Sequence, residues 1–213
     1  MLTAHTKMSR TPASKPGCFP ILPLIPEKLS VEDEKDRSKY LKFLLKSRAG
    51  APENSNKYEK SVKIFEEGGP QEWIELMVAV EEIWMQNSIS GGADRVANLQ
   101  SLIRGQSRVT FDVALDEARM NAQGAHETIR DTHITTALDA VAITIFPYRA
   151  LDQQIRWMRH KMKKPYEMST RRCAAALSRL NNSLPRFPGG TEESKFSESE
   201  LVGMLEWCLS ESF

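Results

Sequence analysis

The stretch 65–84, FEEGGPQEWIELMVAVEEIW, constrains the fold more than any other part of the chain. Gly68 and Gly69 interrupt the preceding segment, and Pro70 suits a first helical turn, where a backbone N–H has no intrahelical partner. Apolar residues then recur at helical spacing on one face: Trp73, Met77, Val80 and Trp84. Two tryptophans on one face need a covering surface. The pattern predicts a buried helix over about 70–87.

Helical periodicity continues through most of the remaining chain, so we expect a mainly α-helical protein. Further helices are predicted over about 93–104, 106–121, 131–146, 148–162 and 169–183, and a last one follows the capping box Ser197-x-x-Glu200. The second of these six, 106–121, is expected to turn Val109, Val113 and either Phe111 or Leu115 inward. The fifth helix from the start of the chain, 148–162, is expected to bury Leu151, Ile155 and Met158. The predicted structural core contains Trp73, Met77, Val80, Trp84 and Leu102.

Two short segments precede the tryptophan-bearing helix. Tyr40 to Lys46 and Tyr58 to Phe65 are rich in aromatic or β-branched residues and partly alternate, and the stretch 50–56 between them is typical of a loop. This pattern predicts a short β-hairpin before the first helical lobe. An alternative stays open, because Tyr40, Leu41, Leu44 and Leu45 also fit a helix that begins near Val31.

Prolines divide the chain into three regions. Residues 1–38 contain five prolines and are predicted to form a disordered or extended Pro-rich arm. Its apolar piece, 19–25, could dock onto a neighbouring subunit or onto its own domain. Pro147 is the predicted boundary between an N-terminal lobe, 39–147, and a C-terminal lobe, 148–213.

Composition and motifs favour neither catalysis nor metal binding. Cys18, Cys173 and Cys208 are widely separated and form no C-x-x-C pair, so we expect a reducing compartment and neither disulfides nor zinc. The histidines have no ligand spacing and are expected in loops or at the surface: His5, His126, His133 and His160. Glu81 and Glu82 are expected on a solvated helical face. We expect no enzyme activity, no cofactor and no small-molecule substrate, and no apolar run approaches the ~18–20 residues of a membrane span.

Charge is unevenly distributed although the formal net charge is only +1. Residues 66–94 hold seven acidic side chains and no Lys or Arg, whereas 156–179 hold eight basic ones against Glu167 alone. The basic segment is predicted to contact the backbone of RNA or the acidic surface of another subunit, and plain solvation is the third alternative. The candidate contact residues are Arg156, Arg159, Lys161, Lys163, Lys164, Arg171 and Arg172.

Several short motifs, taken in order, resemble the capsid region of long-terminal-repeat retrotransposon Gag proteins. The first half contains Phe65, Gly69-Pro70-x-Glu72-Trp73 and Leu102-x-x-Gly105. The second half contains Phe146-Pro147-x-Arg149-Ala150-Leu151, Arg179-Leu180-Asn181-Asn182, Phe187-Pro188-Gly189-Gly190 and Lys195-Phe196-Ser197. The similarity covers about 58–207, and the order and spacing of the pieces carry it.

This resemblance implies a two-lobed helical capsid protein that self-associates into a virus-like shell around the RNA of the element, in the cytoplasm. Its partners would be further copies of itself and RNA, with no membrane. The sequence departs from the family pattern, since it contains no zinc knuckle and no counterpart of the retroviral major homology motif. Two alternatives stay open: a monomeric helical adaptor, a domesticated Gag that binds partner peptides, and an RNA-binding protein.

Overall fold

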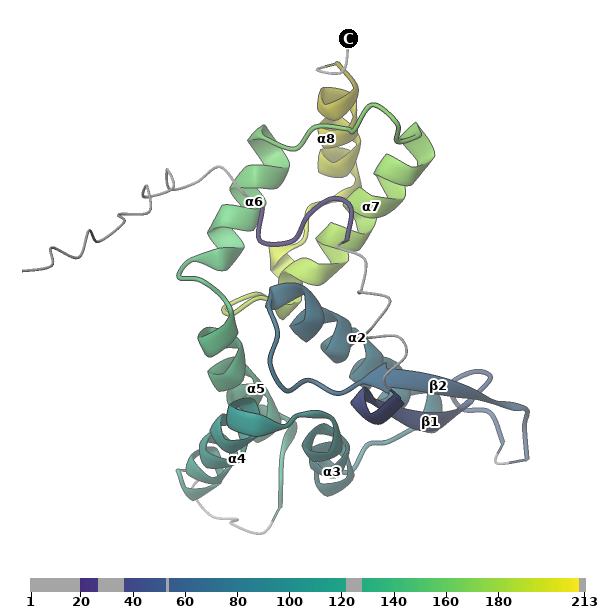
Figure 1. Ribbon diagram of the computed structural model, residues 1–213, viewed down its shortest axis with the longest axis vertical. Coiled ribbons are helices and arrows are strands. Elements are labelled where there is room, and N and C mark those ends of the chain that lie inside the picture. The colour runs from purple at the N-terminus through teal and green to yellow at the C-terminus, as the bar shows by residue number, and fades with distance from the viewer. Residues whose placement is uncertain (1–19, 27–36, 53, 122–127, 211–213) are drawn as a thin grey trace, which may run out of the picture.

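The chain is mainly α-helical, with a two-stranded antiparallel hairpin before the first long helix, as the sequence predicts. The computed structural model describes residues 20–26, 37–52, 54–121 and 128–210 (Figure 1). Strands β1 (Tyr40–Lys46) and β2 (Lys57–Lys63) pair in the register Tyr40↔Lys63. The alternative helix over the Tyr40 segment is therefore wrong. The side chains alternate between the two faces of the hairpin, as strands require, and Leu45 and Val62 lie on its buried face.

The helices follow the predicted ranges to within a few residues. They are α2 (Pro70–Asn87), α3 (Gly92–Leu102), α4 (Gly105–Met120), α5 (Asp131–Ile145), α6 (Ala150–His160), α7 (Thr170–Ser183) and α8 (Glu198–Ser210), with 3-10 turns η1 (Arg37–Lys39), η2 (Leu184–Arg186) and η3 (Glu192–Ser194). Glu72 accepts a hydrogen bond from the Gly69 N–H at 3.1 Å and so caps α2. The predicted box before α8 is present, since Ser197 N–H donates to the Glu200 carboxylate at 2.9 Å.

The first set of motif residues forms one packed cluster around the start of α2. The Phe65 and Trp73 rings meet edge to face at 5.3 Å. Phe65 also exchanges two backbone hydrogen bonds with the α3–α4 junction: its N–H donates to Leu102, and the Arg104 N–H donates to its carbonyl, each at 2.8 Å. The hairpin exit, α2 and α3 are thereby fixed together.

The second set of motif residues forms another cluster below α7. The Phe146 and Phe187 rings lie 5.0 Å apart, and Phe187 is 2 % exposed. The buried Asn181 amide accepts from the Phe196 N–H at 2.8 Å and donates to the Phe196 carbonyl at 3.0 Å. The chain after α7 is therefore folded back onto that helix before α8 begins.

Figure 1 shows α2–α5 and the hairpin at one end of the molecule and α6–α8 at the other. The buried apolar side chains of the two ends belong to one connected cluster, which the Phe146–Phe187 contact helps to join. The division into lobes at 147/148 stays a prediction. No single helix of the described residues has the length and apolarity of a membrane span, and only α5 and α6 taken together, across a 68° bend, meet those two criteria.

Two predictions about side-chain direction are wrong. On α4 the buried residues are Phe111 and Leu115, while Val109 and Val113 are about half exposed. His133, predicted at the surface, is buried in the first turn of α5, where its Nδ1 accepts from the Arg130 N–H at 3.3 Å. Both errors arise because helical spacing defines possible faces without indicating which one the neighbouring helix covers.

On α6, Met158 is buried, and Leu151 and Ile155 are partly buried against the core, as predicted. The polar Gln154, which the prediction did not include, is fully buried on the same side. The inward face of α6 thus includes a side chain that needs hydrogen-bond partners. A segment of the predicted N-terminal arm supplies them.

Candidate interaction site

Residues 20–26 form an irregular segment with bends at 21–22 and 24–25; it lies by α6 and α7 and is drawn in purple in Figure 1. Leu22 and Leu24 are 2 % and 6 % exposed, whereas Ile25 is 53 % exposed. The segment thus docks onto its own chain, which is one of the two outcomes that the sequence left open. Residues 1–19 and 27–36 of the predicted arm, including Phe19, lie outside the described residues.

The Gln154 side chain recognises the backbone of this segment. Its Oε1 accepts from the N–H groups of Ile21 and Leu22 at 3.0 and 2.9 Å, and its Nε2 donates to the Leu22 carbonyl at 3.2 Å. All of these groups are shielded from water or nearly so, where an unpaired polar atom costs about 1–3 kcal/mol. The interaction depends on the bend at Ile21 and Leu22, which turns both N–H groups toward one oxygen, and on an apolar side chain at Leu22 that can be buried.

Arg179 of α7 holds the next two residues. Its Nη2 donates to the carbonyls of Pro23 and Leu24 at 3.0 and 3.2 Å. Partial burial lowers the pKa of this guanidinium, and the nearby Glu75 carboxylate opposes that effect. We call the surface formed by α6 and α7 around Gln154 and Arg179 the arm groove.

The basic stripe predicted from Arg156, Arg159, Lys163 and Lys164 does not exist as one helical face. Helix α6 ends at His160, because the N–H groups of Lys161 and Met162 both turn back to the Trp157 carbonyl at 2.9 Å. Lys164 is partly buried, and its ammonium donates to the carbonyls of Pro165 and Met168 at 3.2 and 3.0 Å. That side chain stabilises the α6–α7 connection.

The other basic candidates divide into paired and unpaired side chains. Arg159 forms an ion pair with Glu200 at 3.3 Å and stacks over the Phe196 ring at 5.0 Å. Four further residues are exposed and form no ion pair with another described residue: Arg156, Lys161, Arg171 and Arg172. Lys163 is exposed as well. Arg156 and Arg159 also border a shallow surface hollow of about 520 Å³, together with Arg149 and His160.

Glu81 is exposed on α2, as predicted, and Glu82 is partly buried; both carboxylates form ion pairs. Glu82 accepts from the Tyr58 hydroxyl at 2.9 Å and forms an ion pair with Lys60 of β2. Hydrogen bonding to Lys60 is the largest cause of the lowered pKa of Glu82. Glu81 binds the Arg186 guanidinium, with Nε at 3.2 Å from Oε1. These contacts fasten α2 to the hairpin on one side and to η2 on the other.

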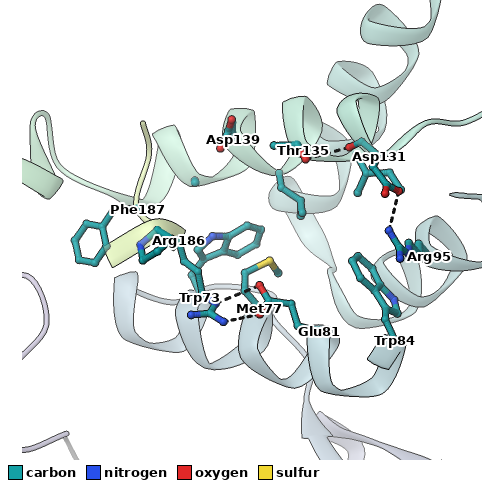
Figure 2. A pocket seen from close by; sticks show the side chains of 14 residues that line it. Trp73, Met77, Glu81, Trp84, Arg95, Asp131, Thr135, Asp139, Arg186 and Phe187 are labelled. Atoms are coloured by element: carbon teal, nitrogen blue, oxygen red, sulfur yellow. Dashed lines mark hydrogen bonds and ion pairs between the residues drawn. The ribbon is translucent and has the colours of Figure 1, made fainter. Parts of the chain in front are cut away.

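A cleft of about 340 Å³ lies between α2, α5 and η2 (Figure 2). Trp73 and Met77 line its apolar part, and Glu81–Arg186 bridges α2 to η2. At the other end Arg95 forms an ion pair with Asp131 at 2.7 Å and lies 5.0 Å from the Trp84 ring. Trp84, predicted as core, is only partly buried because it borders this cleft; Trp73, Met77, Val80 and Leu102 are buried.

The chemistry of the cleft favours binding of apolar side chains. Its 14 lining residues include no Ser, Cys, His or Lys. Each end of the cleft carries an ion pair: Glu81 with Arg186 at one end and Arg95 with Asp131 at the other. The Trp84 indole N–H is buried without a hydrogen-bond partner. Partial burial raises the pKa of the Asp139 carboxyl at the rim. A ligand carrying an apolar group and a hydrogen-bond acceptor would complement these features.

The two described cysteines are buried free thiols. Burial raises the pKa of Cys173, and burial is also the main reason that the pKa of Cys208 is raised to about 11. The Cys208 thiol donates to the Met162 carbonyl at 3.3 Å. Neither thiol has the exposure and lowered pKa of a reactive cysteine. Cys18, His5 and His126 lie outside the described residues, and His160 is exposed on α6.

Fold and site together describe a small helical protein in which residues 20–26 pack against α6 and α7 of their own chain. No protein-family model, no curated protein and no solved structure matches this chain. Sequence patterns did not single out Gln154 or Arg179 as contact residues. A signal for Gln154 does exist, since it lies three residues after Leu151 and four before Met158, on the face where an unpaired amide would be costly.

Proposed function

We propose that this chain is a structural, self-assembling protein of the Gag capsid type, which forms a shell around RNA. The resemblance over about 58–207 supports this proposal, and its motif residues have a common structural use. Phe65 packs on Trp73, and Phe146 packs on Phe187. The motif positions thus stabilise the fold and leave the outer helical faces to make contacts between copies.

The observation that carries the proposal is an apolar stripe on the outer face of α4. Val109, Val113 and Met120 are 53 %, 52 % and 74 % exposed. At 3.6 residues per turn, the three positions fall within about 40° of one another around the helix. Asp116, also exposed, lies on the same face between Val113 and Met120, so the apolar part is the Val109 and Val113 pair with Met120 beyond it. Exposed apolar side chains grouped on one helical face are typical of a protein–protein contact.

Exposed apolar side chains also occur at the opposite end of the molecule. Val202 and Trp207 of α8 are 52 % and 47 % exposed, and α8 lies at the far end from α4 in Figure 1. Two contact surfaces at opposite ends of one subunit allow extended assemblies, in which many weak contacts add up.

Light scattering and negative-stain microscopy over a range of protein and salt concentrations test this proposal. We expect large particles from the unmodified chain and a loss of particles from Val113→Asp. Thr136→Asp is the matched control, because Thr136 is exposed on α5 away from the stripe and should leave assembly intact. A monomer under every condition would overturn the proposal and favour the peptide-binding adaptor.

RNA contact is a second candidate function, favoured by the unpaired basic side chains around α6 and α7. Charge reversal at Arg156, Lys161 and Arg171 should weaken binding of a labelled single-stranded RNA and make its salt dependence shallower. Lys164 is unsuitable for this test, because its ammonium holds two backbone carbonyls. Unchanged affinity after the triple reversal would exclude this surface as the RNA contact.

A further inference from the structure

We propose that residues 20–26 are an exchangeable strap, which fills the arm groove of its own chain in a dilute protein and that of a second copy when copies are crowded. This inference rests on the proposed self-assembly for its setting, but the recognition step can be measured without it. The groove would bind a Leu-Pro-Leu segment. In an assembly, the occupant is residues 20–26 of another subunit.

The groove has the features of a recognition site for a short, bent peptide. Gln154 pairs with the N–H groups of Ile21 and Leu22 and with the C=O of Leu22. Arg179 then binds two successive carbonyls, those of Pro23 and Leu24. Backbone groups are thus recognised over four residues, and the two buried leucines supply the specificity.

The strap itself is suited to such binding. Pro20, Pro23 and Pro26 restrict the backbone of the segment, so less conformational entropy is lost when it binds. Pro23 lies between the two leucines that are buried, and proline needs no partner for a backbone N–H. Ile25, half exposed, contributes less apolar contact than either leucine.

The chain length between strap and body permits exchange. Ten residues, 27–36, separate Pro26 from Arg37, and ten residues span at most about 36 Å when extended. That reach is comparable with the diameter of a small domain, so an adjacent subunit is accessible. A short tether gives the strap an effective concentration of about 1 mM at its own groove. Exchange therefore requires local protein concentrations of that order, such as those within an assembly.

A synthetic peptide of residues 19–27, FPILPLIPE, tests recognition. The double variant Leu22→Asp/Leu24→Asp should vacate its own groove and bind the labelled peptide at least about tenfold more tightly than the unmodified chain, whose tethered strap competes. Peptide binding should be lost when Gln154→Leu is added. The Ile25→Asp change, made in the same segment, should leave the groove occupied. If the aspartates impair folding by circular dichroism, Leu22→Ala/Leu24→Ala serves instead.

A complementation experiment tests exchange between copies. One partner carries Leu22→Asp/Leu24→Asp and has an intact groove; the other carries Gln154→Leu and has an intact strap. Analytical ultracentrifugation should show a 1:1 complex in the mixture and no such complex when Ile25→Asp replaces the first partner. A folded strap variant that binds no peptide at 1 mM, or peptide binding without complementation, would overturn the inference.

These outcomes are separable from the test of self-assembly. Particles from the unmodified chain without complementation would leave the capsid proposal standing and remove the strap exchange. Complementation without particles under any condition would support the strap exchange and overturn the capsid proposal.

Discussion

Asn181 holds Phe196 at both of its backbone polar groups, with distances of 2.8 and 3.0 Å, although fifteen residues separate them. Gln154 binds Leu22 in the same way across 132 residues. In both cases a buried amide on a helix pairs with the backbone of a segment outside the helices. The C-terminal half of the chain is therefore stabilised by specific polar contacts as well as by apolar packing.

The first prediction concerns Asn181. Asn181→Leu preserves apolar volume but leaves the buried N–H and C=O of Phe196 unpaired, so the free energy of unfolding should fall by about 2–5 kcal/mol. Urea unfolding followed by circular dichroism measures this. Asn182→Leu, on the exposed side of the same helix, should change stability by no more than about 0.5 kcal/mol. Equal effects of the two changes would contradict the structural role of Asn181.

The second prediction compares two glycines. A Cβ at Gly190 would approach the carbonyl oxygens of Leu184, Pro185 and Phe187, at 2.9 Å for the last two, whereas a Cβ at Gly203 would meet nothing within 4 Å. Gly190→Ala should therefore destabilise the protein by about 1–3 kcal/mol. Gly203→Ala, within α8, should stabilise it by about 0.5–1 kcal/mol. Thermal unfolding of both variants shows whether the signs are opposite.

Sequence periodicity located the helices well because their apolar faces repeat strongly, as along Trp73, Met77 and Val80. It failed where two faces of one helix were equally apolar. On α4, Val109 and Val113 compete with Phe111 and Leu115, and only the packing against α5 decides between them. Which face of a helix is buried depends on where the neighbouring helix packs. The apolar periodicity of one helix carries no information about that.

The candidate site was less predictable than the fold. Local sequence shows that 19–25 is apolar and proline-rich, but the partner that recognises it, Gln154, is more than a hundred residues away. The basic stripe failed for a different reason. The predicted stripe through Lys163 and Lys164 assumed that the helix runs to residue 162. Helix α6 ends two residues earlier, and the Lys164 ammonium donates to backbone carbonyls.

The third prediction concerns the buried thiols. Cys173 and Cys208 should react with iodoacetamide far more slowly in the native protein at pH 8 than in denaturant, because burial disfavours the thiolate. Mass spectrometry of proteolytic fragments measures each site separately. The pKa of Cys208 is raised from about 9 to about 11, so its contribution to stability is complete below pH 9 and declines as the pH rises toward 11. Rapid native alkylation of Cys208 would contradict its burial.

The fourth prediction concerns the contact between β2 and α2. Glu82→Gln removes the ion pair with Lys60 and should lower stability at pH 7 by up to about 1 kcal/mol. The folded-state pKa of Glu82 is lowered, so this contribution exists above the unfolded pKa and disappears as the pH falls through the folded one. Urea unfolding at pH 7 and pH 3 should show a smaller difference at the lower pH. Glu117→Gln, exposed on α4, is the control and should show no such pH dependence.

The pair of backbone hydrogen bonds between Phe65 and the α3–α4 junction has a consequence for tolerance to insertion. These bonds close the chain into a ring that contains α2 and α3, with the exposed Ser90 and Gly91 at its far turn. Because the base of the ring is fixed, additional residues at that turn lengthen a loop whose ends are already held, and loop entropy grows only slowly with length. The turn is thus the natural place to graft an epitope or a reporter onto this scaffold.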